Sequence, residues 1–169
     1  MRKATTQDFD HIYDILQSSF PKDERRGYEA QKQLLKHPNY RIYVWEQFGK
    51  ICAFISFWKI DGFAFVEHFA VAESYRNCGL GSKMLCTLKE TLCVRICLEV
   101  ELPETDLARR RVEFYKRNGF YYNAYEYEQP AYSKDQVAVP LRIMSTMAPL
   151  TEVEFINVKK QIYKMVYQK

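Results

Sequence analysis

The residues of this chain best suited to chemistry form a short run with two glycines, Arg76-Asn77-Cys78-Gly79-Leu80-Gly81. The run lies between an apolar stretch that ends at Val71 and a helix-like stretch that starts near Ser82. A strand that leads through glycines into a helix leaves backbone N–H groups without partners at the positive end of the helix dipole. Such groups bind phosphate, and glycine lets the backbone approach it closely. The run therefore predicts a phosphate-binding loop; the alternative is a glycine turn that only caps a helix.

Two better-known glycine loops do not fit this run. A P-loop ends in Gly-Lys-Ser/Thr, whereas Gly81 is followed by Ser82-Lys83. The dinucleotide-binding fingerprint has a third glycine at the position where Met84 stands. We therefore expect a phosphate site of another kind.

The segments on both sides of the loop resemble those of a known family. Phe65-Val66-Glu67-His68-Phe69-Ala70-Val71 precedes the loop, and Phe114-Tyr115-Lys116-Arg117-Asn118-Gly119-Phe120 follows it. In this order, and with the loop between them, they resemble the GNAT superfamily of N-acetyltransferases, which use acetyl-CoA. The resemblance covers most of the chain, because Arg2-Lys3-Ala4-Thr5 is similar to the family's first strand and Leu98-Glu99-Val100-Glu101 to its fifth.

The resemblance implies a role for each of these parts. Acetyl-CoA would be the co-substrate, and the loop would hold its pyrophosphate. A backbone N–H near Val71 would bind the oxyanion. The family often has an asparagine seven residues before its tyrosine, where this chain has Ala108, so no contact is assigned there. The implied cofactor contacts are Phe69, Ala70, Val71, Arg76, Asn77, Cys78, Gly79, Leu80, Gly81 and Ser82.

Acetyl transfer to an amine first requires the nitrogen to lose a proton. An alkyl ammonium has a pKa of ~10.4, so a nearby carboxylate, or water, must take that proton. Glu67 is the first candidate, because it lies four residues before Val71 and strand alternation puts both on one face. The alternative is a structural pairing of Glu67 with an arginine or lysine. Glu99 and Glu101 are weaker candidates, since alternation puts both on the polar face of the next strand.

The leaving thiolate, in turn, is helped by a proton donor. Tyr115 matches the family's F-Y-x-x-x-G-F tyrosine, and by that resemblance it would be the general acid. The alternative is a core aromatic, because Ala108, Val112 and Tyr115 share one face of the expected helix.

Four other features have weaker claims to a role. Cys78 lies within the loop, but direct transfer needs no nucleophile and no histidine is placed to activate it. His68 should point away from Glu67, to the opposite strand face, and we expect a structural role for it. The residues Glu24 to Arg26 are either a solvated charge run or, as the family resemblance suggests, part of the acceptor site. Arg111 falls on the apolar helix face, where it would snorkel, pair with a carboxylate or contact a cofactor phosphate.

Composition favours one compact enzyme domain spanning 1–169, with a core over 1–145 and a C-terminal helical extension over 146–169. The net charge of +4 is spread along the chain, so we expect no nucleic-acid partner. The five cysteines form no C-x-x-C pair, which predicts neither disulfides nor a metal site and fits a cytoplasmic location. The polar N-terminal residues do not resemble a signal peptide, and no apolar stretch is long enough for a membrane. A homodimer is compatible with the resemblance.

Hydrophobic periodicity and turn signals predict alternating helices and strands. Together with the resemblance they predict an α/β fold, a mixed and mostly antiparallel sheet of about seven strands flanked by helices, with an added C-terminal helix. Capping boxes mark the first and last helices, at Thr5 with Asp8 and at Thr151 with Glu154. The first expected helix ends near residue 19, and the others span about 28–36, 82–92, 106–117 and 152–166. The expected strands span about 40–46, 50–59, 63–71, 94–102, 121–128 and 137–144.

The sequence thus predicts an N-acetyltransferase that moves an acetyl group from acetyl-CoA to a primary amine, directly and within a ternary complex. The acceptor, a small molecule or a peptide, cannot be read from the sequence. The alternative is a catalytically silent module of the same fold that binds acyl-CoA. Retention of Tyr115 and Glu67 favours the enzyme.

Overall fold

The strands of the computed structural model, which describes residues 1–169, form one seven-stranded sheet in the order β1-β2-β3-β4-β5-β7-β6. The β4 and β5 strands are parallel, and all other neighbours are antiparallel. This confirms the predicted mixed, mostly antiparallel sheet. The strands are β1 Arg2–Lys3, β2 Tyr40–Gln47, β3 Lys50–Ile60, β4 Phe63–Val71, β5 Arg95–Glu101, β6 Phe120–Gln129 and β7 Val139–Thr146.

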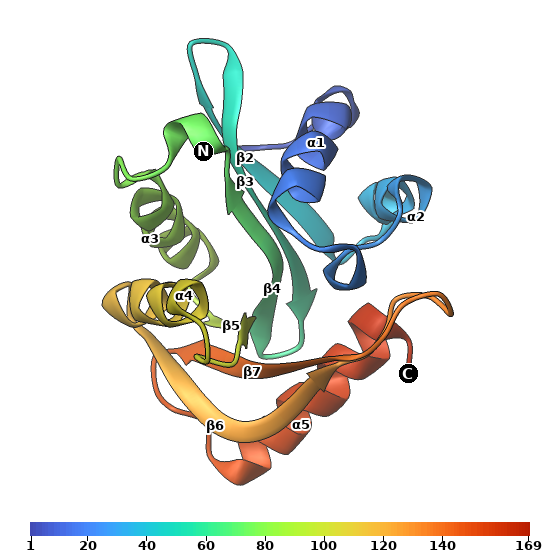
Figure 1. Ribbon diagram of the computed structural model, residues 1–169, viewed down its shortest axis with the longest axis vertical. Helices are drawn as coiled ribbons and strands as arrows, with labels where there is room; N and C mark the ends of the chain where they lie inside the picture. The colour runs from blue at the N-terminus through green and yellow to red at the C-terminus, as the bar shows by residue number, and fades with distance from the viewer.

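Helices cover both faces of the sheet (Figure 1). One core cluster joins α1, α2 and the C-terminal segment to one face, and the other joins α3 and α4 to the opposite face. Both predicted capping boxes are present. The helices are α1 Phe9–Ser19, α2 Tyr28–Gln33, α3 Leu80–Leu92, α4 Asp106–Arg117 and α5 Glu152–Ile162, which continues into a π-helical turn over Tyr163–Tyr167.

Element boundaries differ from the prediction by a few residues, for local reasons. The α3 helix starts at Leu80 rather than near Ser82, because Gly79, at φ 77°, turns the chain directly into the helix. The expected helix over 28–36 tightens into a 3₁₀ turn at Leu34–Lys36. The β7 strand starts at Val139, which pairs with the last residue of β6, Gln129.

The sheet splits between its two central strands. Pairing of β4 with β5 runs from Phe63 with Arg95 only as far as Val66 with Leu98. Beyond that point the strands part, so Glu67 and Glu99 are the first residues past the split on their strands. In Figure 1 the split separates β1 to β4 from β5 to β7 and opens toward α1 and α4. This opening positions the site described below.

A β-bulge at Glu67 changes the facing of the residues around it. On β3, Ser56 pairs with His68 and the next residue, Phe57, pairs with Val66, so Glu67 is the extra residue. Glu67 and His68 therefore face the same side, toward Trp58 and Ser56, while Phe69 packs on the opposite side against Phe114. The expectation that Glu67 shares a face with Val71 and that His68 points the other way is wrong, because it assumed an unbroken alternation.

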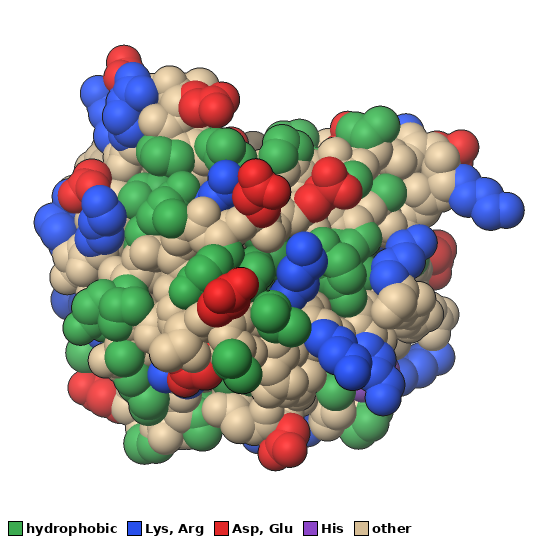
Figure 2. All heavy atoms as spheres, turned by 90° about the horizontal axis from the view of Figure 1, so that it is seen from below, with side chains coloured by type: hydrophobic (Ala, Val, Ile, Leu, Met, Phe, Trp, Pro, Cys, Tyr) green, Lys and Arg blue, Asp and Glu red, His purple; other side chains and the backbone are tan.

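Charged side chains are dispersed on the face shown in Figure 2, where Lys and Arg alternate with Asp and Glu. This distribution agrees with the modest net charge of +4. None of the helices has the length and apolar character that a membrane crossing requires. No set of three or more His, Cys, Asp or Glu side chains is arranged to bind a metal ion.

Candidate active site

The loop before α3 presents a row of free backbone donors. The N–H groups from Asn77 to Ser82 have no acceptor in the protein, and Lys83 is the first to donate, to the Gly79 carbonyl at 3.1 Å. Positive φ angles at Asn77 (63°) and Gly79 (77°) give the loop its curvature. A Cβ on Gly81 would lie 3.1 Å from the Phe114 ring. The loop is therefore a cradle made of backbone, at the positive end of a helix.

We call the space beside this loop the cradle cavity; its volume is about 540 Å³. Most of the residues expected to contact the cofactor line it: Phe69, Val71, Arg76, Asn77, Gly79, Leu80, Gly81 and Ser82. The other two do not. Ala70 faces the neighbouring cavity, and the Cys78 thiol donates to the Tyr75 carbonyl at 2.8 Å. The donor set fits a pyrophosphate, because it offers several N–H groups and the space above Gly79 is open.

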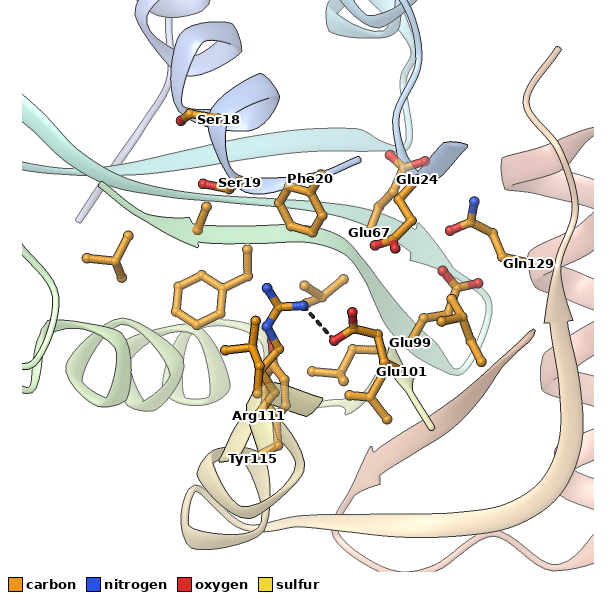
Figure 3. Close-up of a pocket in the computed structure, with 18 of the residues that line it drawn as sticks. Ser18, Ser19, Phe20, Glu24, Glu67, Glu99, Glu101, Arg111, Tyr115 and Gln129 are labelled. Carbon is orange, nitrogen blue, oxygen red and sulfur yellow. Dashed lines mark hydrogen bonds and ion pairs between the residues drawn. The ribbon is translucent and has the colours of Figure 1, made fainter. Parts of the chain in front are cut away.

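A second cavity, of about 420 Å³, opens where β4 and β5 part. We call it the carboxylate cavity, because Glu24, Glu67, Glu99 and Glu101 all line it. Figure 3 shows their side chains converging on the same space from a loop and two strands. Apolar side chains make up much of the rest of its wall, among them Phe20, Val66, Leu98, Val100 and Leu141.

Tyr115 lies where the two cavities meet, since it lines both. Its ring packs between Phe114 and Phe120, and its hydroxyl makes no hydrogen bond within the protein. Burial raises the pKa of the Tyr115 hydroxyl to about 12, so it is protonated at neutral pH and free to donate. Tyr115 is thus packed as a core aromatic and also available to a ligand. The other residues shared by both cavities are Phe69, Val71, Arg76, Leu107 and Arg111.

The Glu67 carboxylate is fully buried and held by three donors. It accepts hydrogen bonds from the Arg26 guanidinium, from Trp58 Nε1 at 3.1 Å and from the Tyr132 hydroxyl at 3.2 Å. Burial alone would raise the pKa of Glu67, but Arg26 and the hydrogen bonds hold it below the ordinary value. Glu67 therefore has the arginine partner that the structural alternative predicted.

The pKa of Glu99 is shifted in the opposite direction. The Tyr167 hydroxyl lies 2.9 Å from both of its carboxylate oxygens, and the Tyr127 hydroxyl donates to one of them. Burial raises the pKa of Glu99 to about 8, although these hydrogen bonds act in the other direction. The strand face expected to be polar is therefore covered here, by tyrosines from β6 and from the C-terminal turn. Glu99 titrates near neutral pH, which Glu67 does not.

The remaining two carboxylates also differ from each other. Glu101 pairs with Arg111 at 2.6 Å, so Arg111 is an exposed residue bound to a carboxylate, one of the roles expected for it. Glu24 is half-buried, and its carboxylate has neither a hydrogen bond nor an ion pair. Burial, followed by the charge of Glu101, raises the pKa of Glu24.

Several residues of the site carry no signal in the sequence. Trp58, Tyr127, Tyr132 and Tyr167 meet Glu67 or Glu99 only through the tertiary fold, from positions 9 to 68 residues away. The abundance of tyrosine, 13 in all, was the one available hint of such contacts. His68 is buried and structural, as expected, with Nε2 3.0 Å from the Glu24 carbonyl oxygen.

Comparison with known proteins agrees with this geometry. The profile of the Acetyltransferase (GNAT) family matches residues 9–120. A protein from Bacteroides thetaiotaomicron assigned to the GNAT acetyltransferases is 31% identical, with a TM-score of 0.91 over 99% of this chain and 98% of its own. Among curated proteins, none matches the chain.

More distant structures share the fold alone. A ribosomal-protein-S18-alanine N-acetyltransferase from Escherichia coli is 20% identical with a TM-score of 0.65, over 89% of this chain and 94% of its own. An aminoglycoside 6'-N-acetyltransferase solved with coenzyme A is 14% identical with a TM-score of 0.66, over 90% of this chain and 100% of its own. By its family profile and its 31% identical structural relative, the chain belongs to the GNAT family of acetyltransferases.

Proposed function

We propose that the protein is an acetyl-CoA-dependent N-acetyltransferase that acts on a primary amine by direct transfer in a ternary complex. The observation that carries the proposal is the position of Tyr115, with its unbonded hydroxyl, where the cradle cavity meets the carboxylate cavity. The cradle would hold the pyrophosphate of acetyl-CoA through the N–H groups from Asn77 to Ser82. The carboxylate cavity would hold the amine, and the reaction would take place between the two.

In this reaction the amine nitrogen forms a bond to the acetyl carbonyl carbon, and the bond from that carbon to sulfur breaks. Tyr115 would donate a hydrogen bond to the departing sulfur. A simple thiol has a pKa of roughly 8.5, so complete proton transfer from a hydroxyl of pKa about 12 is uphill. Tyr115 would therefore act chiefly by stabilising the developing thiolate. The thiolate would leave as the thiol by taking up the second proton that the nitrogen loses on becoming an amide, directly or through water.

The proton of the amine needs an acceptor in the carboxylate cavity. Glu99 suits that task better than Glu67, because its pKa of about 8 lies near the working pH. Glu67 is already held by Arg26, Trp58 and Tyr132, and its pKa is lowered. We therefore propose Glu99 as the proton acceptor, directly or through water. Glu67, paired with Arg26, would hold the bulged strand in place.

The Tyr115→Phe variant tests the proposal. It removes the hydroxyl and keeps the ring packing, so affinity for CoA should persist while acetyl transfer slows by about 10- to 100-fold, the usual effect of losing a hydrogen bond to a charged group. The measurements are CoA-dependent thermal stabilisation and thiol release from acetyl-CoA across a panel of amines. Tyr121→Phe, at an exposed tyrosine on β6, is the matched control.

Two results would contradict the proposal. Unchanged turnover in Tyr115→Phe would make Tyr115 a packing residue. Stabilisation of the wild-type protein by CoA without turnover of any amine would favour the silent acyl-CoA-binding module.

A further inference from the structure

One carboxylate of the carboxylate cavity has no ion-pair partner. Glu67 is neutralised by Arg26, and Glu101 by Arg111. Under the proposed function, Glu99 receives the proton of the reacting amine. Glu24 is then left as a half-buried carboxylate with neither a hydrogen bond nor an ion pair and with no task in the transfer; the positive charge that acts on it is that of Arg111, which is already paired with Glu101. Such a group costs free energy unless a cation meets it.

The place of Glu24 is fixed by its surroundings. Its carbonyl oxygen lies 3.0 Å from His68 Nε2, and the carbonyls on either side of it, of Asp23 and Arg25, accept from Gln129 at 3.0 Å and Gln136 at 2.8 Å. The loop is thus tied to β4 on one side of the split and to β6 and the segment after it on the other. These contacts fix the backbone that carries the Glu24 side chain before a ligand binds, which lowers the entropy that binding costs.

The carboxylate cavity has two different ends. Arg76, Arg111 and Tyr115 line the end that is shared with the cradle cavity. In Figure 3, Glu24 lies apart from Tyr115 and on the side of Glu67, Glu99 and Gln129. The charges of Glu67 and Glu24 both act on Glu99, so these carboxylates lie within electrostatic reach of one another. Apolar side chains, among them Val66, Leu98 and Leu141, make up much of the wall.

We propose that the acceptor carries two cationic nitrogens joined by a hydrocarbon chain, of which one is acetylated and the other binds Glu24. The inference rests on the proposed function and narrows its acceptor to diamines and polyamines. The hydrocarbon chain would lie against the apolar wall. An acceptor with a carboxylate in place of the second nitrogen would meet the unpaired negative charge of Glu24 and be rejected.

Three amines of nearly equal length test the inference: 1,4-diaminobutane, 1-aminopentane and 5-aminopentanoate. They differ only in the far end, which is an ammonium, a methyl group or a carboxylate. We expect kcat/KM for the diamine to exceed that for the other two by about tenfold or more, the effect of one additional ion-paired hydrogen bond. Diamines of three to six carbons, measured in the same way, would locate the preferred spacing.

The Glu24→Gln variant links this preference to Glu24. Because the Glu24 side chain has no partner to lose, the variant should fold, and the ratio of diamine to monoamine kcat/KM should fall about tenfold. Asp23→Asn is the matched control: it removes the same charge from the adjacent residue, which does not line the cavity, and should keep the ratio.

The outcomes separate the inference from the proposed function. Turnover of 1-aminopentane, 5-aminopentanoate or a peptide amine at least as fast as that of the diamine would overturn the inference and leave the N-acetyltransferase in place. A diamine preference that survives in Glu24→Gln would also overturn it. If CoA stabilises the protein and no amine is acetylated, both the proposed N-acetyltransferase function and the inferred diamine acceptor are wrong.

Discussion

Two glutamates at the split of the sheet have pKa values shifted in opposite directions, although their positions on the two strands are equivalent. Glu67 and Glu99 each follow the last paired residue of their strand. An arginine neutralises Glu67, whereas Glu99 has only tyrosine hydroxyls as partners. Burial therefore prevails at Glu99 and raises its pKa, and Arg26 prevails at Glu67 and lowers its pKa. Two carboxyl groups whose pKa values differ in this way are suited to different tasks.

Replacing each glutamate with glutamine should change stability in opposite directions. For Glu99 the folded state keeps a proton up to pH about 8, while the unfolded state loses it near the ordinary value of 4.5. Stability of the wild type should therefore fall as pH rises between these values. In Glu99→Gln this dependence should vanish, so that at pH 9 the variant is more stable than wild type by roughly 2–5 kcal/mol and at pH 4.5 nearly equal to it.

The Glu67→Gln variant provides the contrast. It leaves the buried Arg26 without its counter-charge, and we expect destabilisation of about 3–5 kcal/mol at pH 7. Urea unfolding of both variants and wild type between pH 4.5 and 9 measures the two effects. A Glu99→Gln protein with the same pH dependence as wild type would mean that Glu99 is ionised throughout and has an ordinary pKa.

The β4 strand shows what could and could not be predicted from the sequence of an element. Its existence and its bounds, Phe63–Val71, followed from apolar content and a glycine turn, and the structure confirms both. The bulge could not be predicted, because Phe63 to Val66 is apolar on both faces and carries no alternation that a shift of one residue would break. Yet because of the bulge, the Glu67 side chain faces Arg26 and not the cradle.

At the cradle, glycine is required both for its φ angle and for the open space above it. In Gly79→Val we expect a modest loss of stability, of about 1–2 kcal/mol, from the left-handed backbone, and loss of the thermal stabilisation by CoA. Gly62→Val is the matched control, since Gly62 has nearly the same φ and equally open surroundings in the β3–β4 turn. It should lose similar stability and still respond to CoA. Equal responses to CoA in both variants would remove the loop from the cofactor site.

The C-terminal π-helical turn contacts Glu99 and the arginine that pairs with Glu67. Tyr167 donates to Glu99, and the carbonyl of Val166 accepts from Arg26 at 2.7 Å. Tyr167→Phe removes a donor that favours the charged form of Glu99, so the acidic limb of the kcat/KM profile should move to higher pH. Tyr163→Phe, in the same turn but bonded to the Glu128 carbonyl, should leave the limb in place. A limb unmoved in Tyr167→Phe would separate this turn from catalysis.

For the whole molecule, the order of elements and the family resemblance were sufficient to predict the fold. The cradle could be predicted because its donors lie in one short stretch of backbone, from Asn77 to Ser82. The carboxylate cavity could be predicted only in part. Its charges are set by partners up to 68 residues distant, such as Tyr167 for Glu99, and the local sequence carries no record of such pairings.

The division of the chain into a core over 1–145 and an extension over 146–169 can now be tested as a prediction about folding. In the structure, Leu150, Phe155, Val158, Ile162, Val166 and Tyr167 are all buried within the larger core cluster. Each buried side chain of this kind contributes about 1.5–3 kcal/mol, so their sum matches the roughly 5–15 kcal/mol that stabilises a whole domain. We therefore expect a chain ending at Ser145 to lack a cooperative thermal transition. A chain ending at Tyr167, which lacks only exposed residues, should unfold like wild type. Cooperative unfolding of the shorter chain would establish 1–145 as an independent core, and its CoA-dependent stabilisation would then show whether the cradle works without the C-terminal helix.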